Sequence, residues 1–407
     1  MKITRMPVLP RRLRRAIPWL AAIALGTWPL MEDILPARGA PTQNNAATRL
    51  PLVVLGYNEL GMHCMNQDFS ELCILPPFNT MHAQVIDRTA EHPQIVSSGI
   101  TLNYSIPGNT RSYDKTNFWT YAQALFGTAF PKDYGLAGTT LTGTMTVDAT
   151  GQWGATGIPL TPMTDAGKLD PYQLARLVAT QNGVVVGRTQ PVIPVSWEIS
   201  CNICHKTPGI SAATDILRAH DRRHGTTLES EKPVLCARCH ADPALGAAGT
   251  TGVSTLSHAM HSAHASRMTA ANLKVDCYAC HPGIRTQCQR DIHLAKGMDC
   301  HNCHGDMVQV GDVNRTPWVS EPHCSDCHNV AGHAYEEPRL LFKQSRGHNG
   351  VHCPACHGAP HAITPTTTSA DNVQAMAIQG HTGTINTCTV CHSTQPGDPF
   401  NHTLGDG

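Results

Sequence analysis

A five-residue motif, Cys-x-x-Cys-His, occurs seven times after residue 200 and uses fourteen of the 17 cysteines. With 17 Cys and 24 His in 407 residues, chance would give about 0.04 such motifs. Two thiols at this spacing add to the vinyl groups of one haem, and the adjacent imidazole becomes its proximal iron ligand. The motifs are Cys201/Cys204/His205, Cys236/Cys239/His240, Cys277/Cys280/His281, Cys300/Cys303/His304, Cys324/Cys327/His328, Cys353/Cys356/His357 and Cys388/Cys391/His392.

Structural zinc is the alternative cofactor, because Cys-x-x-Cys pairs and histidines also build tetrahedral zinc sites. Zinc does not require a histidine directly after each second cysteine. The repetition of that histidine therefore favours seven covalently bound haems of the c type.

A surplus of histidines supplies candidates for the second axial ligand of each haem. Residues 201–407 contain 21 histidines, which leaves 14 outside the motifs for seven positions. This number favours ligation by two histidines, which lowers the reduction potential relative to a Met/His pair. The expected distal ligands are His220, His224, His261, His264, His348, His361 and His381.

Spacing supports some of these histidines more than others. His220 and His224 lie four residues apart in a stretch that predicts a helix ending at Gly225, so both project from one face. The same argument applies to three histidines spaced three residues apart, His258, His261 and His264. Histidines inside or directly before a motif are poorer candidates for the second ligand, and three other histidines are intermediate candidates. Methionines are alternative second ligands for a minority of haems. The poorer candidates are His301, His323 and His352; the intermediate ones are His293, His333 and His402; the methionines are Met260, Met268, Met298, Met307 and Met376.

The elements that position these groups divide the chain into three predicted parts. Residues 1–40 combine a basic run with an apolar stretch and small residues, which is typical of a secretory signal peptide; an uncleaved anchor is the alternative. Cleavage after Gly39 fits best, and no later stretch has the length of a membrane helix. We therefore expect a periplasmic or extracellular protein with no transmembrane segment after cleavage.

Residues 41–200 predict a β-rich, sandwich-like domain, because short alternating runs recur between turn residues, as at 100–106 and 141–147. We expect one helix over residues 170–180, closing strands at 184–186 and 192–195, and an edge position for the last strand because of its prolines. Residues 201–407 predict a mostly irregular seven-haem domain with short helices. Its few aromatic residues suggest that haems replace much of the side-chain core.

Charge excludes one class of partner. Without residues 1–40, the chain has 23 basic and 28 acidic side chains. No basic stripe is left to neutralise phosphates, so we expect no nucleic-acid binding.

Three cysteines lie outside the motifs, namely Cys64, Cys73 and Cys288. In an oxidising compartment the simplest interpretation is a disulfide between Cys64 and Cys73, with Cys288 unpaired, but the sequence leaves other pairings open. Two further roles are weaker hypotheses: a catalytic thiol at Cys64 beside His63, and haem ligation by His63 in its own or a neighbouring subunit.

Residues 201–407 resemble the multihaem c-type cytochromes of bacterial respiration, both in the motifs and in segments 220–226, 260–265 and 347–362. The resemblance implies electron transfer along closely packed haems, with redox proteins or extracellular acceptors as partners, and some members polymerise into conductive filaments. The segment 55–64 is also similar to such cytochromes but implies no activity.

The leading hypothesis is therefore an electron carrier without catalytic residues. The alternatives are a multihaem reductase of a nitrogen or sulfur oxyanion, which needs one open haem iron, and a subunit of a conductive filament. The motifs are all ordinary Cys-x-x-Cys-His, with no variant that marks a special haem.

Overall fold

The structure is a computed structural model that describes residues 49–273, 276–329 and 335–397. Residues Leu50–Gly407 form one unit, separate from Met1–Arg49. The expected signal peptide at residues 1–40, His333 and His402 lie outside the described residues.

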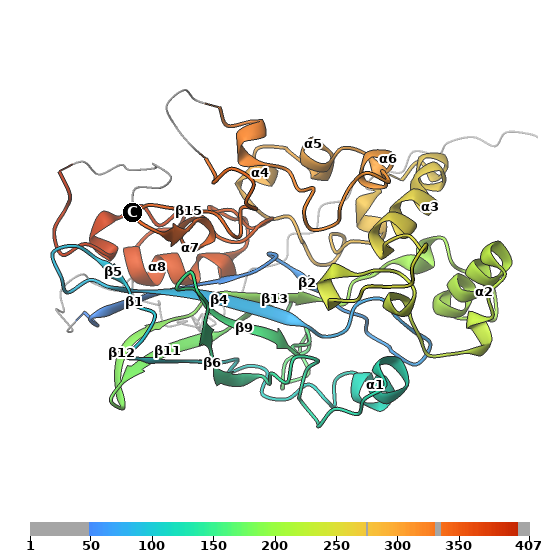
Figure 1. The fold of residues 1–407 in the computed structure, drawn as a ribbon, viewed down its shortest axis with the longest axis horizontal. Coiled ribbons are helices and arrows are strands. Elements are labelled where there is room, and N and C mark those ends of the chain that lie inside the picture. The colour runs from blue at the N-terminus through green and yellow to red at the C-terminus, as the bar shows by residue number, and fades with distance from the viewer. Residues whose placement is uncertain (1–48, 274–275, 330–334, 398–407) are drawn as a thin grey trace, which may run out of the picture. The chain divides into compact units, whose positions relative to one another are not determined.

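The β-rich part begins with a five-stranded sheet (Figure 1). Its strands run in the order β1-β4-β9-β8, with β5 paired to β4, and every pairing is antiparallel. The bounds are β1 (Leu52–Asn58), β4 (Asn79–Asp87), β5 (Gln94–Ile95), β8 (Thr146–Val147) and β9 (Trp153–Ile158).

A second, four-stranded sheet shares its core with the first sheet. Its order is β12-β11-β6-β7, with β6 (Thr101–Ser105), β7 (Thr142–Thr144), β11 (Arg176–Gln181) and β12 (Val184–Thr189). Val54 and Val85 of the first sheet cluster with Leu102 and Leu177 of the second. At Gly187 the sheets approach so closely that a Cβ atom would lie 3.0 Å from the Leu52 oxygen. The strands expected at 100–106 and 184–186 are thus confirmed.

The segment at 141–147 forms two strands rather than one. Strand β7 belongs to the second sheet and β8 to the first, so the chain crosses between the sheets at Met145, which is buried. The chain therefore links the two sheets at this point.

The helix expected over residues 170–180 is wrong, because this segment forms β10 (Tyr172–Leu174) and β11. Ala175, Leu177 and Ala179 are each completely buried. This alternation has the period of a strand, with small alanines pointing inward beside Leu177.

The edge position expected for the last strand is also wrong. Strand β13 (Val192–Ser196) lies between β10 and β2 (His63–Cys64). The parallel pairing with β2 begins only at Val195, one residue after Pro194. Pro194 can occupy a central strand because the bonding with β2 starts beyond its missing N–H group.

The segment after residue 200 consists of helices and very short strands around the Cys-x-x-Cys-His motifs. Its helices are α2 (Ala212–His224), α3 (Leu256–Ala271), α4 (Ile292–Ala295), α5 (Cys300–His304), α6 (Met307–Val310), α7 (Cys353–His357) and α8 (Val373–Gln379), whereas α1 (Phe118–Phe126) belongs to the β-rich part. Two short ladders complete the described elements: β3 (Leu72–Cys73) pairs with β14 (Val234–Leu235), and β15 (Arg346–Gly347) pairs with β16 (Val351–His352).

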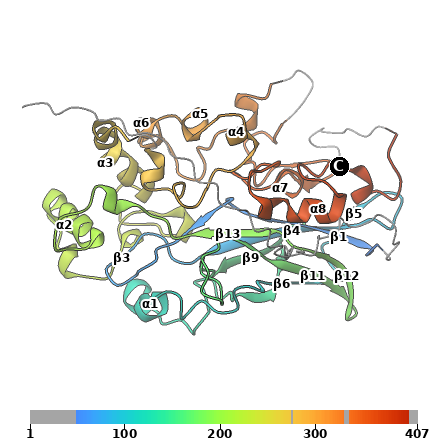
Figure 2. The same ribbon diagram turned by 180° about the vertical axis from the view of Figure 1, so that it is seen from behind.

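Strand β1 is buried on both faces and joins the two parts of the unit. Val54 faces the shared core, whereas Val53 and Leu55 pack against Ala355 and Val390 of the sixth and seventh motifs. Figures 1 and 2 show α7 and α8 on the side of β1 that faces away from β11 and β12. The last two motifs therefore rest directly on the first sheet.

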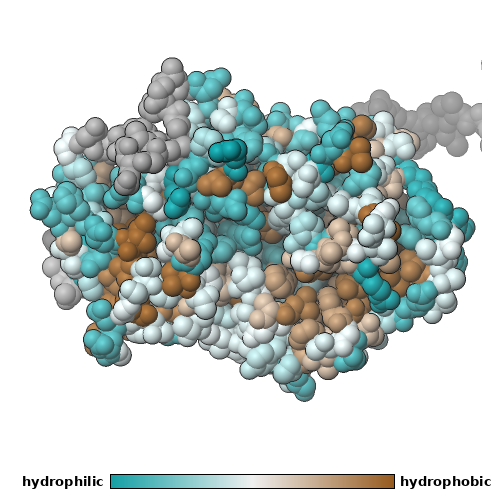
Figure 3. Space-filling model, viewed as in Figure 1, coloured by the Kyte–Doolittle hydropathy of each residue, from teal (hydrophilic) through white to brown (hydrophobic). Residues whose placement is uncertain are grey.

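Among the described residues, no helix combines the length and the apolar character that crossing a bilayer requires. On the face drawn in Figure 3, apolar side chains form separate patches between polar ones.

Candidate haem-binding sites

Each Cys-x-x-Cys-His motif forms a single helical turn. In the first motif the His205 amide donates to the Cys201 carbonyl at 2.9 Å, and the corresponding bonds at His240, His281, His328 and His392 measure 2.8–3.1 Å. The fourth and sixth motifs form the short helices α5 and α7. Positions i, i+3 and i+4 share one face of a helical turn, so the two thiols and the imidazole of a motif lie together.

The two cysteines of a motif differ in their burial. The first cysteine of every motif is half-buried, whereas the second cysteine is exposed in the first five motifs and half-buried in the last two. The exposed ones are Cys204, Cys239, Cys280, Cys303 and Cys327. The predicted attachment points therefore lie at the surface in five motifs and against the first sheet in the other two.

Cys239 of the second motif is exposed. Its carbonyl accepts from the Thr250 amide at 2.8 Å, which holds the backbone while the side chain stays open to solvent. Attachment at Cys239 therefore remains a prediction from its spacing to Cys236 and His240.

Six motif histidines each lie beside a second histidine from elsewhere in the described chain. Their ring centres are 6.0–6.3 Å apart. With the motif residue first, the pairs are His205 with His264, His240 with His220, His281 with His261, His304 with His361, His328 with His293, and His392 with His348.

This separation tests whether the residues fit a haem or a zinc ion. A metal–nitrogen bond of about 2 Å and about 1.1 Å from the nitrogen to the ring centre separate two rings on opposite sides of a metal by about 6.2 Å. Two rings on a tetrahedral metal would be only about 5 Å apart. The observed 6.0–6.3 Å fits opposite axial positions, with two thiols beside each pair for covalent attachment. The residues present therefore fit haem c.

Hydrogen bonds at Nδ1 orient several of these rings. The Nδ1 atoms of His240, His261 and His264 donate to the carbonyls of Ser254, Ser257 and Met260 at 2.8, 2.7 and 2.6 Å. A carbonyl only accepts, so the proton sits on Nδ1 and the Nε2 lone pair is available for a metal.

Side-chain oxygens, rather than carbonyls, contact the Nδ1 atoms of two further paired histidines, His293 and His220. Asp291 Oδ2 lies 3.1 Å from His293 Nδ1. Thr226 Oγ1 donates to Asp221 at 2.6 Å and therefore accepts from His220 Nδ1 at 2.9 Å. Both arrangements match the outer-shell partners that hold metal-binding imidazoles.

The electrostatics favour neutral imidazoles at two of the motif histidines. Burial, and then the neighbouring histidines, lower the pKa of His281 to about 4. Burial, followed by His361, likewise lowers the pKa of His304 to about 4. Neutral imidazole is the form that binds metals.

The motifs also lie close to one another. A hydrogen bond between the thiols of Cys277 and Cys300 raises the pKa of Cys277, which places the third and fourth motifs in contact. Although Cys280 is exposed at the surface, the surrounding protein desolvates its thiol and raises its pKa. The thiols of Cys201 and Cys204 add to the rise, so the first motif adjoins the third.

The same proximity continues toward the C-terminus. For three more thiols, the largest cause of a raised pKa is desolvation and the second is a thiol of another motif. Cys327 acts in this way on Cys303, Cys324 on Cys353, and Cys391 on Cys356. From these contacts, neighbouring motifs follow one another in the order first, third, fourth, fifth, sixth and seventh; we call this order the neighbour sequence.

Helix α3 gathers the first three motifs. It carries His261 and His264, the partners of the third and first motif histidines. Two residues before the helix, the Ser254 carbonyl accepts the hydrogen bond from His240 of the second motif. Thr255 caps the helix by accepting from the His258 amide at 3.2 Å. A single capped helix thus sets the relative positions of three motifs.

Five of the seven expected distal ligands belong to the pairs, and two lie elsewhere. His224 is exposed, and its ring centre lies 4.7 Å from that of His220. Both nitrogens of His381 have hydroxyl or carbonyl partners, namely Thr382 O and Thr387 Oγ1, each at 2.9 Å.

His293 is the paired residue that the sequence ranked below these candidates. It stands on α4, whose first turn is capped by Asp291, and Asp291 also contacts the imidazole. The Asp-x-His pattern at this cap is the signal that could have singled it out.

Three further histidines, His323, His352 and His63, lie beside residues other than histidine. His323 Nδ1 contacts Glu336 at 3.0 Å, and His352 Nε2 lies 3.1 Å from Thr150 Oγ1. His63 lies beside the Phe78 ring, with centres 6.5 Å apart, and burial lowers its pKa to about 4. His357 ends α7, and its carbonyl accepts from the Thr364 amide at 2.8 Å.

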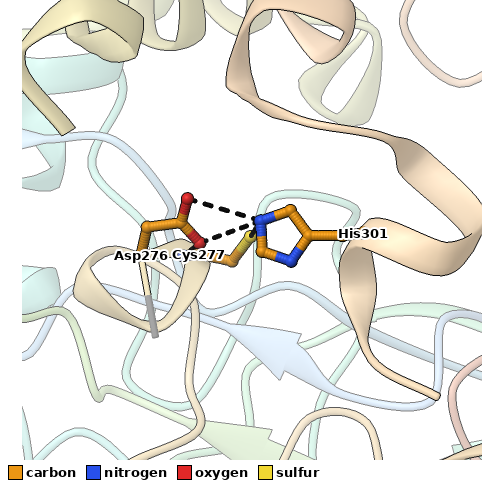
Figure 4. Close-up of side chains that lie close together, drawn as sticks. All are labelled: Asp276, Cys277 and His301. Carbon is orange, nitrogen blue, oxygen red and sulfur yellow. Dashed lines mark hydrogen bonds and ion pairs between the residues drawn. The ribbon is translucent and has the colours of Figure 1, made fainter. Parts of the chain in front are cut away.

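Asp276, Cys277 and His301 bring three metal-binding side chains within 4.8 Å of one another (Figure 4). His301 Nε2 lies 3.1 Å from Asp276 and 4.0 Å from Cys277 Sγ. Cys277 belongs to the third motif, so its sulfur is committed if haem is attached there. The His301–Asp276 contact then acts as an ion pair between the third and fourth motifs, since Asp276 and Asp299 outweigh burial and raise the pKa of His301.

No family model, curated protein or solved structure matches the chain in searches of all three kinds. The functional argument therefore rests on the motifs and their geometry.

Proposed function

We propose that the protein carries electrons through a row of seven covalently attached c-type haems. The observation that supports this most directly is the set of six histidine pairs with ring centres 6.0–6.3 Å apart, each beside a motif with two thiols. When bound, the haems would supply reversible one-electron chemistry.

The chain's own residues would have three tasks. The motif thiols would attach the haems, the paired imidazoles would bind their irons, and the Nδ1 partners would keep the imidazoles in the required tautomer. The neighbour sequence of the motifs would keep the haems close enough for transfer between them.

The β-rich, sandwich-like part would serve as the support for the end of the row. Val53, Leu55 and Tyr57 of β1 pack against the last two motifs, and Arg88 Nη1 donates to the Val390 carbonyl at 3.1 Å. We propose export to the periplasm or beyond, where redox proteins or extracellular acceptors would exchange electrons with the row.

The test combines haem counting with electron paramagnetic resonance of the oxidised protein. We expect seven haems per chain and low-spin signals, because two imidazoles would close the iron at each of the six paired motifs and the surplus of histidines predicts the same for the seventh. The double variant Cys236→Ser/Cys239→Ser should lose one haem, whereas Cys73→Ser should keep seven. Zinc without haem would refute the proposal, and a stoichiometric high-spin component would point to a reductase with an open iron.

A further inference from the structure

Three thiols remain outside the haem motifs, and the structure separates them into two locations. Cys64 ends β2, Cys73 ends β3, and Cys288 lies in the loop between the third and fourth motifs. All three are free thiols in the structure. Cys73 pairs in register with Leu235, directly before the second motif, so it faces a different part of the chain.

The segments that carry Cys64 and Cys288 are held together through Ser196. Cys64 is the register partner of Ser196 in the parallel ladder of β2 and β13. Ser196 Oγ lies 2.7 Å from Thr286 Oγ1, two residues before Cys288. This hydroxyl contact brings the end of β2 to the loop.

Arg290 adds a second connection between the same segments. Its Nη1 atom donates to the Gly61 carbonyl at 2.6 Å and to the Cys288 carbonyl at 3.1 Å. One nitrogen therefore joins the turn before β2 to Cys288 itself. Together with Ser196 and Thr286, it holds the two cysteine-bearing segments from both sides.

The electrostatics of the thiols agree with this placement. Burial raises the pKa of Cys64, and the next contribution comes from Cys288. For Cys73, the contributions to its raised pKa after burial come from Cys236 and Asp242 instead. Cys64 and Cys288 are therefore neighbours, and Cys73 lies apart from both.

We propose that Cys64 and Cys288 form a disulfide in the exported, haem-loaded protein. The inference rests on the export included in the proposed function, because disulfides persist in oxidising compartments. Two S–H bonds break, one S–S bond forms, and two protons and two electrons leave the thiols. A protein or small-molecule disulfide accepts them and becomes two thiols.

The bond would fasten β2 to the loop between the third and fourth motifs, where Cys277 and Cys300 are in contact. It replaces the simplest pairing from sequence, Cys64 with Cys73, and leaves Cys73 as a thiol.

The experiment is thiol mapping of the haem-loaded protein by mass spectrometry. The protein is denatured in guanidinium with an alkylating reagent and no reductant, and then digested. We expect one alkylated cysteine, Cys73, and a cross-linked peptide pair that contains Cys64 and Cys288. Prior reduction should give three alkylated cysteines. Haem counting on the same sample separates this result from a failure of haem attachment, which would expose motif thiols to the reagent.

Two variants serve as matched controls. Cys64→Ser should make Cys288 reactive, whereas Cys73→Ser should leave the cross-linked pair intact. A link between Cys64 and Cys73, or alkylation of both Cys64 and Cys288 without reductant in protein that carries its haems, would overturn the proposal.

Discussion

Arg290 and Asp371 form a two-pronged ion pair in the interior, with Nε to Oδ2 at 2.6 Å and Nη2 to Oδ1 at 2.8 Å. The two side chains are 0% and 4% exposed. The backbone amide of Arg290 also donates to the carbonyl of His361, the partner of His304, at 2.9 Å. The pair therefore ties the loop between the third and fourth motifs to the segment before α8.

Replacing Arg290 by Met should strongly destabilise the protein, because it leaves the Asp371 carboxylate buried without a partner. Loss of one member of a buried pair costs about 3–5 kcal/mol. Denaturant unfolding of haem-loaded protein measures the change. Arg111→Met, which removes an exposed pair with Asp114, should leave the midpoint unchanged. Equal midpoints for the two variants would contradict this assignment.

His220 and His224 provide a test of the histidine pairs on a single helix. His220→Ala should turn one of the seven haems high-spin, because it removes the partner of His240. His224→Ala should leave all seven low-spin, since His224 is exposed on the last turn of α2. Electron paramagnetic resonance of the oxidised variants distinguishes the two results. A high-spin signal from the His224 variant alone would mean that His224, and not His220, is the partner of His240.

Glu198 provides a prediction for pH dependence. Its carboxylate, 2% exposed, accepts from the amides of Ile284, Arg285 and Thr286 at 2.6–2.9 Å and from Thr286 Oγ1 at 2.7 Å. Burial acts to raise its pKa, but these hydrogen bonds outweigh it and lower the pKa below 4.5. The folded pKa lies below the unfolded value, so the stabilisation is present above about pH 4.5 and is lost as the pH falls through the folded pKa.

Glu198→Gln should therefore lower the thermal midpoint at pH 7, and the difference from the parent should shrink at pH 3. The amide offers one accepting oxygen and places an NH2 group against amide donors. Thermal unfolding at both pH values checks this. Glu91→Gln, at an exposed position, is the control and should match the parent at both. A deficit that is the same at pH 3 and pH 7 would show that the charge of Glu198 does not matter.

The sequence predicted the strands that alternate clearly and missed those in which alanine faces inward. The run at 100–106 has large apolar residues at every second position, and β6 forms within it. Between residues 170 and 180 the inward positions include Ala175 and Ala179, whose small side chains carry a weak pattern, whereas Leu174, Leu177 and Val178 suggested a helix. Residues 176–181 form strand β11 because they pair with β6 on one side and with β12 on the other.

The motif residues could be located from sequence, and so could five of the paired histidines, but the motif that each histidine would pair with could not. Covalent attachment demands a fixed local spacing, so each set of thiols and imidazole is visible in five residues. The partner of His205 is His264, on a helix after the second motif, and the partner of His304 is His361, beyond the sixth. Such pairs depend on how distant segments pack, which histidine counts alone do not specify.

Haem removal should affect the two parts of the chain differently. The shared core of the two sheets contains large side chains such as Phe69, Leu102, Phe118 and Leu177. After residue 200 many of the buried apolar residues are alanines, as in α3 and the motif turns. Small side chains bury little apolar area, so we expect this segment to depend on the proposed haems for its core.

Protein made without haem attachment should therefore show fast amide exchange in α3 and in the motif turns, while β6 and β11 stay protected as in the loaded protein. Hydrogen exchange followed by mass spectrometry compares both states, and the strands serve as the internal control. Protection of α3 at the loaded level would contradict the dependence on haem. Loss of protection in β6 and β11 as well would mean that the β-rich part needs the packed motifs on β1 to fold.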